Sequence, residues 1–106
     1  MDYSQLSDFE INWSVSNYLS GRFIIYDEYV WDSEEEKTFN PCTKAEDAWP
    51  IIESNKINVE WHQWKDDSDK PYALNNATMI SRYDDNPLRA AMIVFLMMQD
   101  KANANS

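Results

Sequence analysis

Residues 86–99 read Asn-Pro-Leu-Arg-Ala-Ala-Met-Ile-Val-Phe-Leu-Met-Met-Gln, and this stretch decides the fold. Asparagine is favoured just before a helix and proline at its first position, so Asn86 and Pro87 predict a helix start. The run up to Gln99 predicts a helix of about 12 residues, roughly 18 Å long. Apolar side chains go nearly all the way round this long C-terminal helix, and such a helix must be covered on more than one face.

Two arrangements would cover that helix. Either the rest of the chain surrounds it, or a second copy packs on its back face, which would make a homodimer through the Asn86–Gln99 helix. Methionines such as Met92 and Met97 suit both readings, because methionine fills gaps in a core and also adapts to partner surfaces.

Earlier in the chain, capping signals predict two more helices. Ser7 followed by Glu10 is a capping box, and the apolar spacing after it predicts a helix over 7–20 with Gly21 as its C-terminal cap. Thr43 followed by Glu46 repeats the capping box and predicts a short helix to Ile52. Pro50 lies inside this second helix and predicts a kink or a 3₁₀ start.

Strands are predicted where β-branched and aromatic residues gather. Phe23–Trp31 is one such run, which Asp27-Glu28 interrupts as a turn or bulge. Ile57–Trp64 alternates, with Trp61 on the expected core face and Trp64 on the opposite face, where it is the better interface candidate. A short edge strand is predicted within Ala77–Tyr83.

These elements predict an α+β fold, in which a small antiparallel sheet of two to four strands packs with two to three helices. A chain of 106 residues is of single-domain size. We expect one globular domain over 1–100 and a disordered tail over 101–106, whose residues have nothing to bury.

The sequence offers little material for familiar catalytic or metal sites. It contains one histidine (His62), one cysteine (Cys42) and one glycine, so a thiol–imidazole pair has minimal support and a glycine-rich phosphate loop is excluded. Asp66-Asp67-Ser68-Asp69 lacks the glycine and the later glutamate of a calcium loop. No cofactor, metal or catalytic residue is predicted.

The formal net charge is −10, which disfavours direct contact with nucleic acid and favours basic protein surfaces. Two interpretations of the acidic loops stay open: a solvated surface, or a docking site that imitates phosphates. The residues that would contact a partner in the second case are Glu34, Glu35, Glu36, Trp64, Asp66, Asp67, Asp69, Asp84 and Asp85.

The chain is expected to be cytoplasmic. Its start has neither a basic segment nor an apolar segment of a signal peptide. Its longest apolar run, from Leu88 to Met98, contains Arg89 and falls short of the ~20 residues that cross a bilayer. A lone cysteine agrees with a reducing compartment.

Three stretches together resemble the NinX-like family of phage and prophage proteins, a domain of unknown function. They are Met1–Asn12, Asn40–Ile52 around Asn-Pro-Cys-Thr and Ala-Glu-Asp-Ala-Trp-Pro-Ile-Ile, and Asn86–Met98. The resemblance implies a phage origin and a role inside the infected bacterial cell, and it supplies no catalytic residues.

The leading hypothesis is a non-enzymatic phage accessory protein that binds a host or phage protein, in one version as an acidic inhibitor of host defence. One alternative is a recombination or replication factor that contacts nucleic acid. Another is a small enzyme that uses carboxylates or Cys42.

Overall fold

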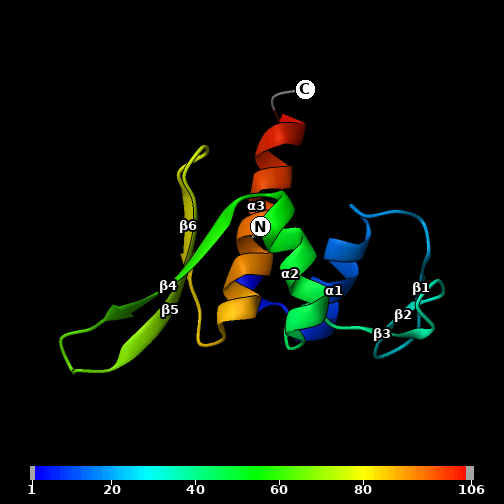
Figure 1. Cartoon of the computed structure of the whole chain (residues 1–106), viewed down its shortest axis with the longest axis horizontal. Helices are drawn as coiled ribbons and strands as arrows, with labels where there is room; N and C mark the ends of the chain where they lie inside the picture. The colour runs from blue at the N-terminus through cyan, green and yellow to red at the C-terminus, as the bar shows by residue number, and fades with distance from the viewer. Residues whose placement is uncertain (1, 105–106) are drawn as a thin grey trace.

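Helix α3 (Pro87–Ala104) runs through the centre of the molecule, with a β-sheet on one side and two helices on the other (Figure 1). The computed structural model describes residues 2–104. The predicted start is confirmed, because the Asn86 Oδ1 accepts the backbone N–H groups of Leu88 at 2.8 Å and Arg89 at 3.2 Å. Every residue from 90 to 96 is buried by the same chain, while residues 88, 89 and 97–99 are partly exposed.

The end of α3 differs from the sequence prediction. We expected disorder from residue 101, but the helix continues to Ala104, and residues 105–106 lie outside the described part of the chain. Side chains near this end have partners in the N-terminal segment: the Tyr3 hydroxyl donates a hydrogen bond to Asp100, and the Asn103 amide to the Tyr18 hydroxyl. These contacts hold a polar segment that buries little apolar surface.

The strands form two three-stranded antiparallel sheets, which confirms the α+β class but not the expectation of a single sheet. The Asp27-Glu28 interruption is confirmed as the turn of a hairpin in the first sheet. Sheet A consists of β1 (Phe23–Ile25), β2 (Val30–Asp32) and β3 (Lys37–Phe39). Sheet B consists of β4 (Ile57–Gln63), β5 (Asp69–Asn75) and β6 (Ile80–Tyr83).

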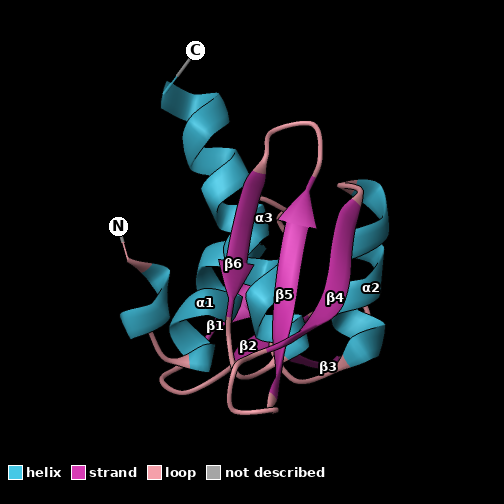
Figure 2. Ribbon diagram, turned by 90° about the vertical axis from the view of Figure 1, so that its left-hand side faces the viewer, coloured by secondary structure: helices cyan, strands magenta, loops and turns pink. Residues whose placement is uncertain are grey.

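Sheet B packs one face on α3 and leaves the other face uncovered by any described element (Figure 2). Its central strand, β5, was not predicted, and it contains Pro71, a residue type that is rare in the interior of a sheet. The ladder between β5 and β6 begins at Tyr72, and Asp84 beyond it donates its N–H to the Pro71 carbonyl. The missing N–H of Pro71 therefore falls just past the end of the ladder, where no strand hydrogen bond is lost.

The prediction that Trp61 lies in the core is wrong. Trp61 pairs with Pro71, so it does share the α3-facing side of the sheet with Ile57, as the alternation predicted. However, the β4–β5 hairpin extends beyond α3 (Figure 1), so Trp61 has no helix to cover it and is 62% exposed, whereas Ile57 is 5% exposed.

Helix α1 (Asp8–Ser16) follows a short 3₁₀ turn (Tyr3–Gln5) and carries the predicted capping box of Ser7 and Glu10. It ends at Ser16, earlier than predicted, because the next backbone bonds are tighter turn bonds such as Tyr18 N–H to Val15 O. Gly21 does not cap it and has no positive φ.

Helix α2 (Ala45–Ser54) is present, but its predicted capping box is wrong. Lys44 occupies the N-cap position and makes no side-chain capping bond. The helix also continues through Pro50, without a 3₁₀ start. Asp47 in its first turn is buried and accepts the Asn40 N–H at 2.9 Å, which fixes the helix to the preceding loop.

Candidate functional site

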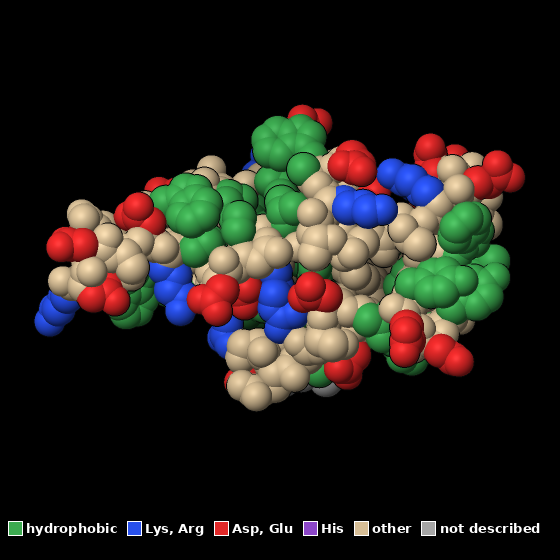
Figure 3. All heavy atoms as spheres, turned by 90° about the horizontal axis from the view of Figure 1, so that it is seen from below, with side chains coloured by type: hydrophobic (Ala, Val, Ile, Leu, Met, Phe, Trp, Pro, Cys, Tyr) green, Lys and Arg blue, Asp and Glu red, His purple; other side chains and the backbone are tan. Residues whose placement is uncertain are grey.

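The acidic residues predicted to bind a partner do not share one face. Glu34, Glu35 and Glu36 lie in the β2–β3 turn of sheet A, whereas Asp66 and Asp67 lie in the β4–β5 turn. These turns occupy opposite ends of the molecule, whose longest extent is 44 Å (Figure 1, Figure 3). Because exposed charges are screened beyond about 8 Å at physiological salt, the two groups act independently.

Asp84 and Asp85, in the connection between β6 and α3, differ from each other. The Asp84 side chain is 14% exposed and accepts hydrogen bonds from the Arg89 Nε and the Asn86 N–H, so it stabilises the start of α3. Asp85 is fully in solvent, and its Oδ1 lies 3.6 Å from the Nζ of Lys70 on β5. Asp85 therefore belongs to the same end of the molecule as Asp66, Asp67 and Asp69.

The uncovered face of sheet B carries a cluster of aromatic side chains. Pro71, Ala73 and Asn75 are buried toward α3, so strand alternation places Lys70, Tyr72 and Leu74 on the opposite face. The strand register adds neighbours on this same face: His62 and Glu60 from β4, and Tyr83 and Ser81 from β6. We call the set His62, Trp64, Tyr72 and Tyr83 the aromatic face.

The four rings of the aromatic face contact one another. The ring centroids of His62 and Tyr72 are 4.3 Å apart, those of Tyr72 and Tyr83 are 4.6 Å apart, and Trp64 meets Tyr83 edge-on at 5.5 Å. The Nδ1 of His62 also lies 2.7 Å from the Tyr83 hydroxyl. These contacts restrain the side chains while leaving Trp64 48% and Tyr83 39% exposed.

Acidic groups surround the aromatic face. Glu60 pairs directly with Tyr72 across the strands, and the Asp66–Asp69 turn follows Trp64. The Nζ of Lys70 lies 5.7 Å from the centroid of the Trp64 ring. The negative face of an aromatic ring attracts cations, and nearby carboxylates add to that attraction. This arrangement is suited to a cationic partner group.

Sequence reasoning identified Trp64 and the acidic turn but missed Tyr72 and Tyr83. The alternation of residues 57–63 already placed His62 on the polar face of its strand. Because β5 was not predicted, nothing indicated that Tyr72 and Tyr83 would join His62 there.

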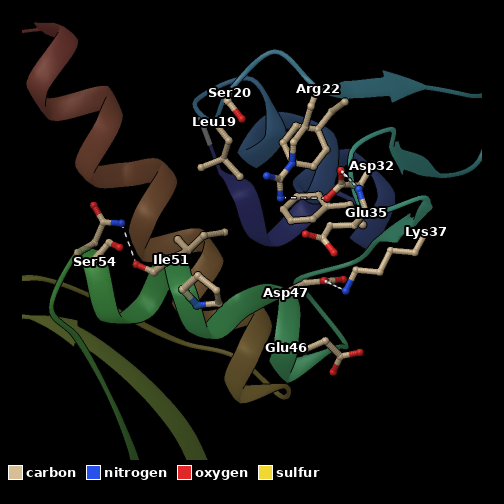
Figure 4. Close-up of a pocket in the computed structure, with 14 residues that line it drawn as sticks. Leu19, Ser20, Arg22, Asp32, Glu35, Lys37, Glu46, Asp47, Ile51 and Ser54 are labelled. Atoms are coloured by element: carbon tan, nitrogen blue, oxygen red, sulfur yellow. Dashed lines mark hydrogen bonds and ion pairs between the residues drawn. The ribbon is translucent and has the colours of Figure 1, made fainter.

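A second candidate site is a half-open pocket of about 510 Å³ between sheet A and α2 (Figure 4). Two ion pairs lie in its wall: the Arg22 Nη2 is 3.0 Å from the Asp32 Oδ2, and the Lys37 Nζ is 2.9 Å from the Asp47 Oδ1. The hydrogen bond that Lys37 donates to Asp47 raises the pKa of the Lys37 ammonium, so Lys37 stays charged at neutral pH.

The thiol and the histidine do not form a catalytic pair. Cys42 is completely buried, with its backbone N–H bonded to the Asn12 side chain, whereas His62 lies on the aromatic face. Burial raises the pKa of the Cys42 thiol to about 12, so the reactive thiolate is absent at neutral pH.

Residues 2–104 contain no group of three His, Cys, Asp or Glu side chains arranged to hold a metal ion. Within the same range, no helix is both long and apolar enough to cross a membrane.

A comparison with protein families matches residues 2–99 to the family described as Bacteriophage P22, NinX. No curated protein and no solved structure matches the chain.

Proposed function

The chain belongs to the Bacteriophage P22, NinX family and is thus a phage protein, and on this premise we propose that it acts by binding another protein rather than by catalysis. Its partner is a host or phage protein with a basic surface, met inside the infected bacterial cell. The observation that carries the proposal is the aromatic face on the uncovered side of sheet B.

Aromatic side chains support a role in protein binding for an energetic reason. Tyrosine and tryptophan provide much of the binding energy at protein interfaces, because they bury large areas while only a few rotatable side-chain bonds become fixed. In the aromatic face, the mutual ring contacts already restrict these bonds, so association would lose little further side-chain entropy.

The surrounding charges support a basic partner. The aromatic face and its turn carry more acidic than basic side chains: Glu60, Asp66, Asp67, Asp69 and Asp85 against Lys65 and Lys70. Lys70 between Trp64 and Asp85 is an internal example of the contact that a partner's lysine or arginine would make.

A second candidate is contact with single-stranded nucleic acid, which the aromatic rings favour because bases stack on such surfaces. The charges oppose it, since carboxylates beside the rings would repel phosphates. Binding of a single-stranded oligonucleotide that falls steeply with salt would support this candidate over a protein partner.

The proposal is tested by capture from a lysate of infected cells with the tagged chain. A Trp64→Ala variant and an Asp66→Lys/Asp69→Lys variant should each lose the captured protein. The matched controls are Trp49→Ala, a tryptophan 59% exposed on α2, and Glu34→Lys/Glu36→Lys at the opposite end. Both controls should capture as the unchanged chain does.

Equal capture by all four variants would contradict the aromatic face as the contact surface. A captured partner with an acidic contact surface would contradict the charge argument. If the partner is a host defence protein that binds DNA, the chain should compete with DNA for it, as an acidic inhibitor must.

A further inference from the structure

The pocket between sheet A and α2 lies at the other end of the molecule from the aromatic face (Figure 1, Figure 4). Its deeper wall is apolar: Phe39 and Ile51 are each 5% exposed, and the ring of Phe23 packs on Phe39 at 4.6 Å between centroids. A pocket of about 510 Å³ has room for a small organic group that contacts this wall.

The buried carboxylates of the pocket are already satisfied. Asp32 accepts the backbone N–H groups of Glu34 and Glu35 in addition to its ion pair with Arg22. Asp47 likewise accepts the Asn40 N–H in addition to its ion pair with Lys37. These two aspartates and their cations balance in charge and hold the walls in place.

Two further carboxylates line the pocket without such partners. Among the described residues, none forms a hydrogen bond or an ion pair with the side chain of Glu35 or Glu46. Glu35 extends from the β2–β3 turn into the space facing α2, where Glu46 lies in the first turn (Figure 4). The pocket therefore has an apolar wall and an excess of negative charge.

This combination selects among the classes of guest. An anion would be repelled by Glu35 and Glu46, while a neutral apolar group would leave these carboxylates with only the attraction of Lys37, whose ion pair is with Asp47. A cation on an apolar stem satisfies both parts, because aliphatic stems pack on apolar surface while the charged head stays near water and carboxylates.

We propose that this pocket binds an alkyl cation, with the stem against Phe23, Phe39 and Ile51 and the ammonium or guanidinium group near Glu35 and Glu46. Lysine and arginine side chains of a partner carry this chemistry, and so do free amines. The site is separate from the aromatic face and does not depend on the function proposed for it.

The test is an NMR titration of the ¹⁵N-labelled full chain with n-butylguanidinium, with n-butylurea as the neutral analogue. We expect saturable shifts of the amides around Phe39 and Ile51 with the cation and none with the urea. A Glu35→Gln/Glu46→Gln variant should bind at least tenfold more weakly. Both side chains are exposed, so this variant should fold, which its spectrum will verify.

The matched control is Asp66→Asn/Asp69→Asn, which makes the same change in net charge at the other end of the molecule. It should bind the cation as the unchanged chain does. Non-saturable shifts, equal binding of the urea, or equal weakening in the control would each overturn the proposal.

Two further ligands identify the source of the cation. A blocked Gly-Arg-Gly peptide that saturates the pocket at lower concentration than agmatine would indicate a protein side chain, and the reverse order would indicate a free amine. Failure of both to bind would overturn the proposal. A Trp64→Ala variant should leave all these titrations unchanged, so the outcome is distinct from that of the capture experiment.

Discussion

The guanidinium group of Arg89 joins the first turn of α3 to Asp8 at the start of α1, with 2.7 Å between Nη1 and Oδ1. Its Nη2 also donates to the carbonyl oxygen of Leu6 at 2.6 Å, and its Nε to Asp84 at 3.3 Å. The Arg89 side chain is 13% exposed. One side chain thus fixes the N-terminal segment and the β6–α3 connection to the central helix.

Replacing Arg89 with methionine should lower the free energy of unfolding by about 3 kcal/mol, because buried acceptors lose their donor. Urea denaturation followed by tryptophan fluorescence measures this loss. Arg82→Met is the matched control: its ion pair with Asp2 has the same 2.7 Å distance but lies on the surface. That variant should lose less than about 1 kcal/mol. Equal losses of unfolding free energy in the two variants would contradict the argument that Arg89 contributes more because it is buried.

Asn75 is the second polar side chain whose loss should be costly. It is 3% exposed, and its Nδ2 donates to the carbonyl of Asn55 at 2.9 Å while its Oδ1 accepts the Thr78 N–H at 2.9 Å. Asn75→Ala should lower the free energy of unfolding by about 2 kcal/mol, since several buried groups lose a partner. Asn76→Ala, at the exposed neighbour, should change it by less than about 0.5 kcal/mol. A similar effect at both positions would contradict the structure of this turn.

The sequence predicted most reliably those elements that local chemistry determines. The Asn86-Pro87 start of α3 and the Ser7–Glu10 capping box were both correct, because each depends on side chains within one helical turn. The Thr43–Glu46 box has the same pattern but was wrong, since the Asn40 carbonyl accepts the N–H groups of Thr43 and Lys44 in a turn that places Lys44 at the N-cap.

Features that depend on distant contacts were not predictable from the pattern. The alternation around Trp61 correctly gave the side of the sheet, but the exposure of Trp61 depends on where α3 begins. The aromatic face requires the pairing of three strands, and the central one was not predicted. The pocket likewise requires α2 to pack beside sheet A, which no local pattern encodes.

Cys42 should be unreactive in the folded protein. Because its thiol is buried and its pKa is raised to about 12, iodoacetamide at pH 8 should alkylate it far more slowly in buffer than in urea. Mass spectrometry of the two reactions measures the difference. Fast alkylation of the native chain would contradict the burial of this residue.

The same pKa predicts a loss of stability in alkali. The ordinary thiol pKa is 9.0, so above that pH the unfolded chain loses the Cys42 proton while the folded chain keeps it until about pH 12. The contribution of this group is therefore complete below pH 9 and is lost as pH rises through that window. A Cys42→Ala variant should lose less stability between pH 9 and 11 than the unchanged chain. Parallel curves would contradict this prediction.

Asp32 should determine the local stability of sheet A. Its carboxylate is 1% exposed and binds Arg22 together with two N–H groups of the β2–β3 turn. Asp32→Asn should cost about 1–3 kcal/mol, because the ion pair is lost inside the fold. Faster hydrogen exchange should be confined to residues 23–39. Glu34→Gln, at the exposed second partner of Arg22, should leave exchange nearly unchanged.

The central position of α3 also constrains how the protein is made in the cell. Residues 87–104 are synthesised after both sheets and the other two helices, yet they form the surface on which sheet B, α1 and α2 pack. Until the ribosome has added these residues, the earlier segments expose Ile11, Ile52 and Ala73 to solvent and to chaperones. Assembly of the domain is therefore tied to completion of this helix, and a ribosome that stalls before residue 87 holds a chain that lacks the central part of its core.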